Sequence, residues 1–136
     1  MDPPPTIVYF DGVCGLCNRL VDFILPRDRR KRILFSPLQS ARGEAIRRRA
    51  GLSPAADLDT VVVEEGERIY VRSAGVLRVL RRLGPPWSLL YYAGIALPRP
   101  VRDALYRFVA RRRYRWFGKR SECRAPTPAE RARFVE

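Results

Sequence analysis

Two of the three cysteines in this 136-residue chain, Cys14 and Cys17, form a C-x-x-C pair within the stretch Tyr9–Asn18. The apolar run Ile7–Phe10 comes just before them, and apolar side chains recur every fourth position after it, which predicts a strand, a turn and an amphipathic helix. Cys14 would lie at the helix start, where unpaired N–H groups and the helix dipole favour a thiolate. The spacing places both sulfur atoms on one side of the first turn, close enough for a disulfide or a shared metal ion.

The cysteine pair has two chemical interpretations, thiol-disulfide exchange and zinc binding. A zinc site needs four soft or imidazole ligands, and the chain has no His and only one further cysteine, Cys123. We therefore favour redox exchange, in which the Cys14 thiolate attacks a disulfide and Cys17 resolves the mixed disulfide. We expect Cys14 to attack because it lies further out on the helix end, where it would be more exposed. The only redox group required is then the Cys14–Cys17 disulfide, with no separate cofactor.

A family resemblance rests on the same residues. Asp11, Cys14 and Cys17 form the pattern D-x-x-C-x-x-C, and the chain resembles the DCC family of predicted thiol-disulfide oxidoreductases. The similarity includes two later stretches, Tyr70–Ser73 and Arg113–Gly118. It implies a thioredoxin-like fold and dithiol redox activity on a protein or small-molecule disulfide. The substrate and the electron donor stay unknown.

The residues around the cysteines are candidates for contact with the substrate. In the motif they are Gly12, Val13, Gly15 and Leu16. Thioredoxin-like proteins usually carry a cis-proline just before the third strand, facing the cysteines, and in this chain Thr60 and Val61 fall at that place. A cis bond before a residue other than proline costs about 2.5–4 kcal/mol, so we expect this bond to be trans.

Asp11 and Ser73 each have two interpretations. Asp11 could exchange a proton with Cys17 during resolution. Alternatively, its side chain could accept backbone hydrogen bonds from the turn Gly12–Val13. Ser73 resembles the position at which glutaredoxins hold glutathione at a helix N-terminus. We favour its simpler interpretation as the N-cap of the helix that follows.

The order of predicted elements indicates an α/β fold. The first elements are a strand over Ile7–Phe10, a helix from Cys14 to a stop at Pro26, a strand at Ile33–Phe35, and a helix over Ala41–Ala50 capped by Ser40. A hairpin of Thr60–Glu64 and Arg68–Arg72 follows, and then a helix from Ser73 to Leu83. This βαβαββα order predicts a thioredoxin-like unit over residues 6–84, within a single domain of residues 1–136.

Residues 85–136 are expected to add a helical extension and a tail. One helix is predicted over Trp87–Leu97, and Pro100 suits the first turn of another that ends before Gly118. The tail holds a short predicted helix at Ala129–Phe134.

Cys123 also lies in this tail, and three roles are open for it: a free thiol, a resolving cysteine, or a third ligand beside Cys14 and Cys17. A disulfide would require a partner Cα within about 7 Å, and we expect the Cys14–Cys17 disulfide to dominate.

The composition is globular and strongly basic. Hydrophobic residues make up 46% of the chain, which argues against disorder, while the net charge of +13 should attract acidic partners, nucleic acid or anionic membranes. A coding bias toward Arg is the simpler explanation of that charge. The segment Met1–Pro5 lacks the features of a secretory signal, so we expect a cytoplasmic protein.

Two later stretches raise the alternative of an Arg-rich binding protein whose C-x-x-C pair is regulatory or binds a metal. Arg111–Trp116 alternates cations with aromatic residues, as single-stranded nucleic-acid sites do. We expect instead the end of an amphipathic helix with Trp116 buried, and no nucleic-acid partner. Trp87–Leu97 is shorter than the roughly 20 residues that span a bilayer, but it could lie on an anionic membrane surface.

Overall fold

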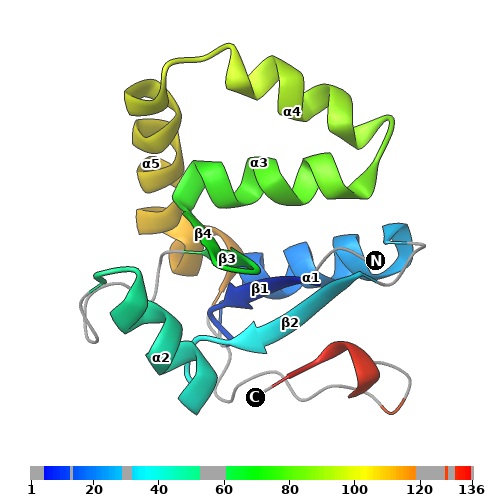
Figure 1. The fold of residues 1–136 in the computed structure, drawn as a ribbon. Helices are drawn as coiled ribbons and strands as arrows, with labels where there is room; N and C mark the ends of the chain where they lie inside the picture. Colours follow the sequence, from blue (N-terminus) through cyan, green and yellow to red (C-terminus); the bar gives the residue numbers. More distant parts are fainter. Residues whose placement is uncertain are drawn as a thin grey trace.

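The computed structural model describes residues 5–12, 14–28, 32–52, 61–118, 128 and 131–135. A four-stranded sheet with the order β2-β1-β3-β4 lies at the centre (Figure 1). Its strands are β1 (Thr6–Phe10), β2 (Ile33–Pro37), β3 (Val62–Glu65) and β4 (Arg68–Val71). β1 and β2 run parallel, and each of the other two neighbouring pairs is antiparallel. This order and these directions give the expected thioredoxin-like fold.

Helices cover both faces of the sheet. α1 (Gly15–Arg27) and α3 (Arg72–Leu83) lie on one face, and α2 (Ala41–Arg49) lies on the other (Figure 1). Side chains alternate between the two faces of a strand. Val8 and Phe10 of β1 therefore join the core under α1 and α3, while Tyr9 joins the core under α2. This arrangement brings the end of β1 and the start of α1 together at one edge of the sheet.

The first two helices begin as the sequence predicts, but α1 ends later. Ser40 caps α2 by accepting a 3.0 Å hydrogen bond from the Gly43 N–H. The predicted stop of α1 at Pro26 is wrong, because the Asp28 N–H donates to the Ile24 carbonyl at 2.9 Å and so continues the helical pattern past the proline.

The predicted N-cap role of Ser73 is also wrong. α3 begins one residue earlier, with Val71 as its N-cap and Arg72 in the left-handed region at φ 54°. The Ser73 hydroxyl donates instead to the carboxylate of Asp103, which lies on a later helix. Because Ser73 lies inside the first turn of α3, its hydroxyl is not at the capping position, and it donates to a charged acceptor instead.

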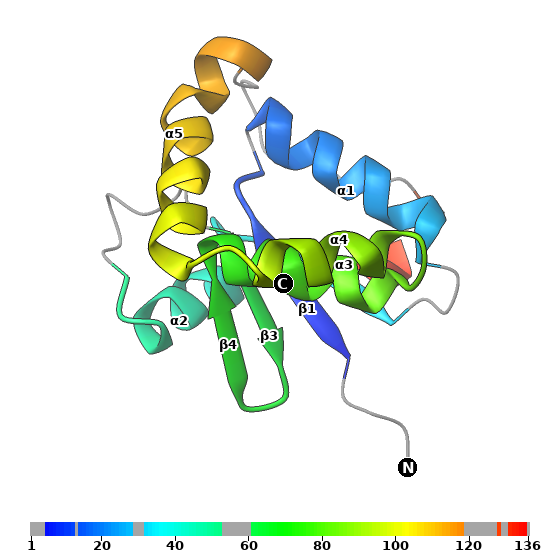
Figure 2. The same cartoon turned by 90° about the horizontal axis from the view of Figure 1, so that it is seen from above.

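The extension consists of α4 (Trp87–Ile95) and α5 (Arg99–Phe117). α4 packs on α3, while α5 crosses beside α3 and reaches the start of α1 (Figure 2). The expected burial of Trp116 is wrong, because this side chain is 52% exposed and packs edge-on against Phe108 on the outside of α5. Within the described part of the chain, no helix combines the length and the apolar composition needed to cross a membrane.

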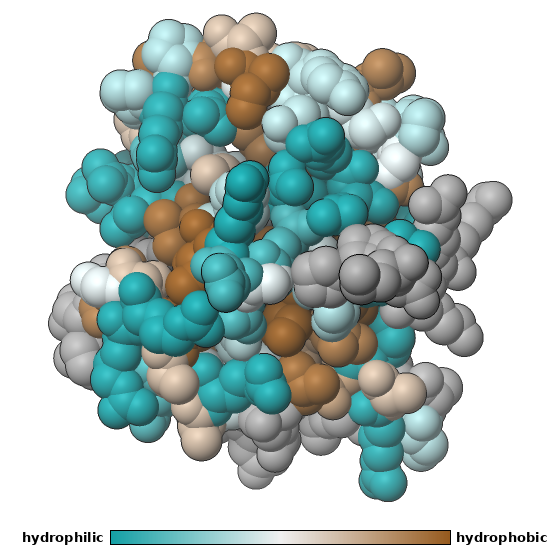
Figure 3. All heavy atoms as spheres, viewed as in Figure 1, coloured by the Kyte–Doolittle hydropathy of each residue, from teal (hydrophilic) through white to brown (hydrophobic). Residues whose placement is uncertain are grey.

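Exposed large apolar side chains gather on α4, on α5 and between them, and brown side chains are visible over α4 in Figure 3. They are Leu89, Leu90, Tyr92, Ile95, Leu97, Val101, Leu105, Phe108 and Trp116. The sequence indicated a membrane contact for the part of this surface within Trp87–Leu97, and that contact stays a prediction.

The last described residues return to the edge of the sheet beside β2 (Figure 1). A helix was predicted over 129–134. Residues 129 and 130 lie outside the described residues, and the described part forms a 3₁₀ turn at Arg131–Arg133. Phe134 pairs in parallel with Phe35, and the Val135 N–H donates to the Phe35 carbonyl at 2.8 Å. This segment therefore extends the sheet by a short bridge.

Candidate active site

Cys14 occupies the predicted position at the start of α1. It is the N-cap residue of the helix, with an extended backbone at φ −81° and ψ 126°. Its N–H donates to the Asp11 carbonyl at 3.1 Å, which closes the turn after β1. One turn into the helix, the Asn18 amide donates to the carbonyls of Cys14 at 2.8 Å and Gly12 at 3.0 Å. These bonds hold the loop that carries the first cysteine.

Asp11 is fully buried beside this loop and is held by Gln39. The Gln39 side chain donates to the Asp11 carboxylate at 2.7 Å and accepts from the Gly12 N–H at 3.1 Å. Neither Gln39 nor Asn18 was identified from the sequence. The sequence does contain a signal for Gln39, because this residue follows β2. The carboxyl ends of parallel strands meet at one edge of a sheet, and binding and catalytic sites often form at that edge.

The two cysteine side chains contact each other and are not joined by a disulfide. A hydrogen bond to Cys14, burial, and the negative charges of Cys14 and Asp11 all raise the pKa of the Cys17 thiol, against a smaller opposing effect of a hydrogen bond from the Asp11 backbone. Cys17 therefore holds its proton strongly while Cys14 is beside it.

The expected exposure of Cys14 is wrong, because Cys14 is 0% exposed and Cys17 is 7% exposed. The end of α5 lies over the start of α1 (Figure 2), and the Gly15 N–H donates to the Gly118 carbonyl at 3.0 Å. The N–H of Gly15, the first residue of the helix, is therefore already hydrogen-bonded. The sequence predicts instead that the N–H groups at the helix start are free to stabilise a thiolate. Arg19 adds to this contact by lying 5.4 Å over the ring of Phe117.

Val61 and Ser73 lie in the wall of a cavity that also includes Leu16 and Cys17. The Val61 N–H donates to the Tyr106 hydroxyl at 2.7 Å, and its carbonyl accepts from the Arg72 N–H at 3.1 Å. The protein itself therefore occupies both backbone groups at the position where a substrate backbone was expected. Val13, Thr60 and Cys123 lie outside the described residues, and their roles stay predictions.

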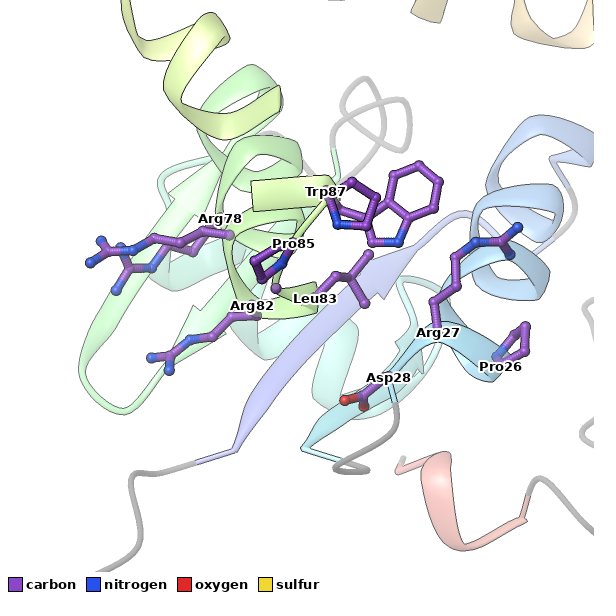
Figure 4. Close-up of a pocket in the computed structure, with 11 residues that line it drawn as sticks. Pro26, Arg27, Asp28, Arg78, Arg82, Leu83, Pro85 and Trp87 are labelled. Atoms are coloured by element: carbon purple, nitrogen blue, oxygen red, sulfur yellow. The ribbon is translucent and has the colours of Figure 1, made fainter. Parts of the chain in front are cut away.

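A cavity of about 670 Å³, larger than the one beside Cys17, lies at the opposite end of α1, between that helix and the turn before α4 (Figure 4). Its lining includes Arg27, Arg78, Arg82 and Trp87. Most of these cations have partners: Arg78 and Arg82 pair with Glu65, and Arg27 lies 3.9 Å over the ring of Phe23. Because none of the described residues that line this cavity is a cysteine, we do not assign the redox chemistry to it.

The zinc alternative has no support from the described residues. Within the ranges given above, no group of three or more Cys, Asp or Glu side chains could hold a metal ion. Cys123 is not among those residues, so its role as a ligand stays a prediction.

The chain matches known proteins over most of its length. Residues 8–119 match the family of DCC1-like thiol-disulfide oxidoreductases. The uncharacterized protein YuxK of Bacillus subtilis (strain 168) is 42% identical over 132 residues, which are 97% of this chain and 95% of YuxK. The chloroplastic DCC family protein At1g52590 of Arabidopsis thaliana is 39% identical over 117 residues, which are 86% of this chain and 67% of that protein. No solved structure matches. The chain therefore belongs to the family of DCC1-like thiol-disulfide oxidoreductases.

Proposed function

We propose that this protein reduces disulfides with the dithiol of Cys14 and Cys17, with Cys14 attacking and Cys17 resolving. The observation that carries the proposal is the contact between the two thiols, in which the pKa of Cys17 is raised by its hydrogen bond to Cys14 and by burial. A thiol that keeps its proton does not compete for the incoming disulfide. The division of roles thus follows from the protonation of Cys17 rather than from the exposure of Cys14.

The proposed cycle has two exchange steps. The Cys14 thiolate attacks one sulfur of the substrate disulfide, so a Cys14–substrate disulfide forms and the first substrate thiolate leaves. Cys17 then loses its proton and attacks the sulfur of Cys14, which forms the Cys14–Cys17 disulfide and releases the second substrate thiol. The substrate gains two electrons and the protein loses two, so a two-electron thiol reductant must restore the pair.

Asp11 is our proposed acceptor for the proton that Cys17 loses. Its carboxylate is buried, and its negative charge acts on the Cys17 thiol. Once Cys14 is bonded to the substrate, Cys14 no longer carries a negative charge and no longer raises the pKa of Cys17, so transfer to a nearby base becomes easier. Gln39 would hold the carboxylate in position through its 2.7 Å hydrogen bond.

Insulin reduction with dithiothreitol tests the proposed activity. The chain should accelerate the precipitation of reduced insulin, and Cys14→Ser should remove this acceleration because no attacking thiolate remains. When incubated with insulin without dithiothreitol, Cys17→Ser should instead accumulate a mixed disulfide with insulin, because the first step proceeds and the second cannot. Cys123→Ser is the matched control and should retain the activity. A Cys14→Ser variant as active as the parent chain would disprove the assignment.

Alkylation at pH 6 tests the order of reactivity. In a Cys123→Ser background, iodoacetamide should label Cys14 before Cys17, because alkylation requires a thiolate and the pKa of Cys17 is raised. The small difference in exposure favours Cys17, but a pKa shift changes the thiolate fraction tenfold per unit and should decide the outcome. Peptide mapping after partial labelling gives the ratio, and faster labelling of Cys17 would reverse the proposed roles.

A further inference from the structure

The cavity beside Cys17 is nearly free of polar surface. It has a volume of about 460 Å³ and lies among α1, α3, α4 and α5. Its apolar lining includes Leu16, Leu20, Val76, Leu97, Leu105 and Val109. Such a volume lies within the roughly 300–1,000 Å³ of small-molecule sites, and such a lining suits a hydrocarbon chain.

One cation lies in this apolar wall. Arg102 of α5 lines the cavity, and its Nε and Nη1 atoms are buried without a hydrogen-bond partner. Burying a charged donor without a partner is unfavourable, and the usual remedy is an anion at hydrogen-bond distance. The carboxylate next along α5, Asp103, accepts from Ser73 and lies 3.7 Å from Arg99. The described side chains thus leave Arg102 without an anionic partner.

The surroundings of Arg102 on its other side are also basic. A second cavity of about 390 Å³ shares Arg102 and includes Arg78 and Arg99. No Asp or Glu is among the described residues that line either cavity. An anion at Arg102 would therefore meet no carboxylate from the described residues of either wall.

We propose that the cavity beside Cys17 binds a single-chain fatty acid, with its carboxylate at Arg102 and its hydrocarbon chain among the four helices. Arg102 is the one cation among the described residues of this cavity, which favours a monoanion, and the volume fits one acyl chain better than the two of a phospholipid. Leu97 and Leu105 line the cavity and are 45% and 59% exposed, so the hydrocarbon chain of the ligand can enter between α4 and α5. Cys17 forms part of the wall, so the ligand would lie against the resolving thiol of the proposed cycle.

Calorimetric titration with decanoate, below its micelle concentration, tests this inference on the full chain. Decanoate should bind one site, and decan-1-ol should bind at least tenfold more weakly because it lacks the charge, a difference of about 1.4 kcal/mol. Arg102→Met keeps the apolar stem and should weaken decanoate binding at least tenfold while leaving decan-1-ol binding unchanged. Arg107→Met, an exposed cation on the same helix, should leave both affinities unchanged.

A second variant keeps the inference testable if Arg102→Met fails to fold. Val109→Phe adds volume inside the cavity and should weaken both ligands together. Equal affinity for decanoate and decan-1-ol, no binding of decanoate to the parent chain, or an equal loss in Arg107→Met would overturn the inference. Binding requires no thiol chemistry, so a negative result here and a negative insulin assay are independent of each other.

Discussion

Replacing Gly15 with alanine should destabilise the protein and expose Cys14. A Cβ atom at Gly15 would lie 2.0 Å from the Phe117 carbonyl oxygen and 2.9 Å from its carbon, and both belong to backbone that cannot rotate away. The end of α5 must then move, with loss of the 3.0 Å hydrogen bond from the Gly15 N–H to Gly118. Overpacking and the lost hydrogen bond together should cost roughly 2–4 kcal/mol. Urea denaturation measures the loss.

The alkylation rate of Cys14 gives the second readout of this substitution. In a chain that keeps Cys14 as the single thiol, Gly15→Ala should increase the labelling rate severalfold, because the covering segment is displaced. Gly51→Ala is the control: this glycine has φ 74° with no atom near its Cβ position, so alanine should cost only about 1–2 kcal/mol and leave the labelling rate unchanged. Unchanged stability and labelling in Gly15→Ala would show that the end of α5 does not cover the site.

Replacing Glu65 with glutamine should strongly destabilise the protein. Glu65 is 7% exposed, accepts from Thr6 at 3.2 Å, and pairs with both Arg78 and Arg82 of α3. Removing one partner of a buried pair costs about 3–5 kcal/mol. Because the two arginines keep some contact with water, we expect a value near 3 kcal/mol. Glu67→Gln, in the exposed hairpin turn, should stay within about 0.5 kcal/mol.

The cost of Glu65→Gln should depend on pH. Burial alone would raise the pKa of Glu65, but the hydrogen bonds and charges of Arg78 and Arg82 outweigh it and hold the pKa below its usual range. A lowered folded-state pKa means that the stabilisation is fully present above the unfolded-state value, about 4.3, and is lost as pH falls through the folded-state value. The difference between parent and variant should therefore narrow from pH 7 to pH 3. A constant difference would mean that folding does not shift the pKa of Glu65.

The periodic patterns predicted the sheet unit because each element obeys local rules. Apolar alternation located the strands, and the Ser40 cap located α2, since both signals come from neighbouring residues. The helix start at Cys14 was predicted in the same way. Proline was a weaker guide: Pro26 lies in the last turn of α1, where the Asp28 N–H still reaches the Ile24 carbonyl.

The parts that could not be predicted depend on contacts between distant segments. The hydrogen bond between Gly15 and Gly118 joins two residues that meet only because of how α5 packs against α1. No local sequence pattern encodes this packing. The neighbouring residues predicted that Ser73 caps its helix, because its hydrogen-bond partner, Asp103, is distant in the sequence. Trp116 lies on the outside of α5, although a large aromatic side chain gains most from burial.

The short bridge between Phe134 and Phe35 has a consequence for synthesis of the chain. β2 is an edge strand, and unpaired N–H and C=O groups along an edge can pair with another chain. The Val135 N–H occupies the Phe35 carbonyl, and Arg133 donates to the Ile33 carbonyl at 3.0 Å. On the ribosome, β1 and β2 emerge about a hundred residues before these groups do, so the nascent sheet carries an open edge during most of translation. Chaperone contact with that edge would be most valuable in this interval.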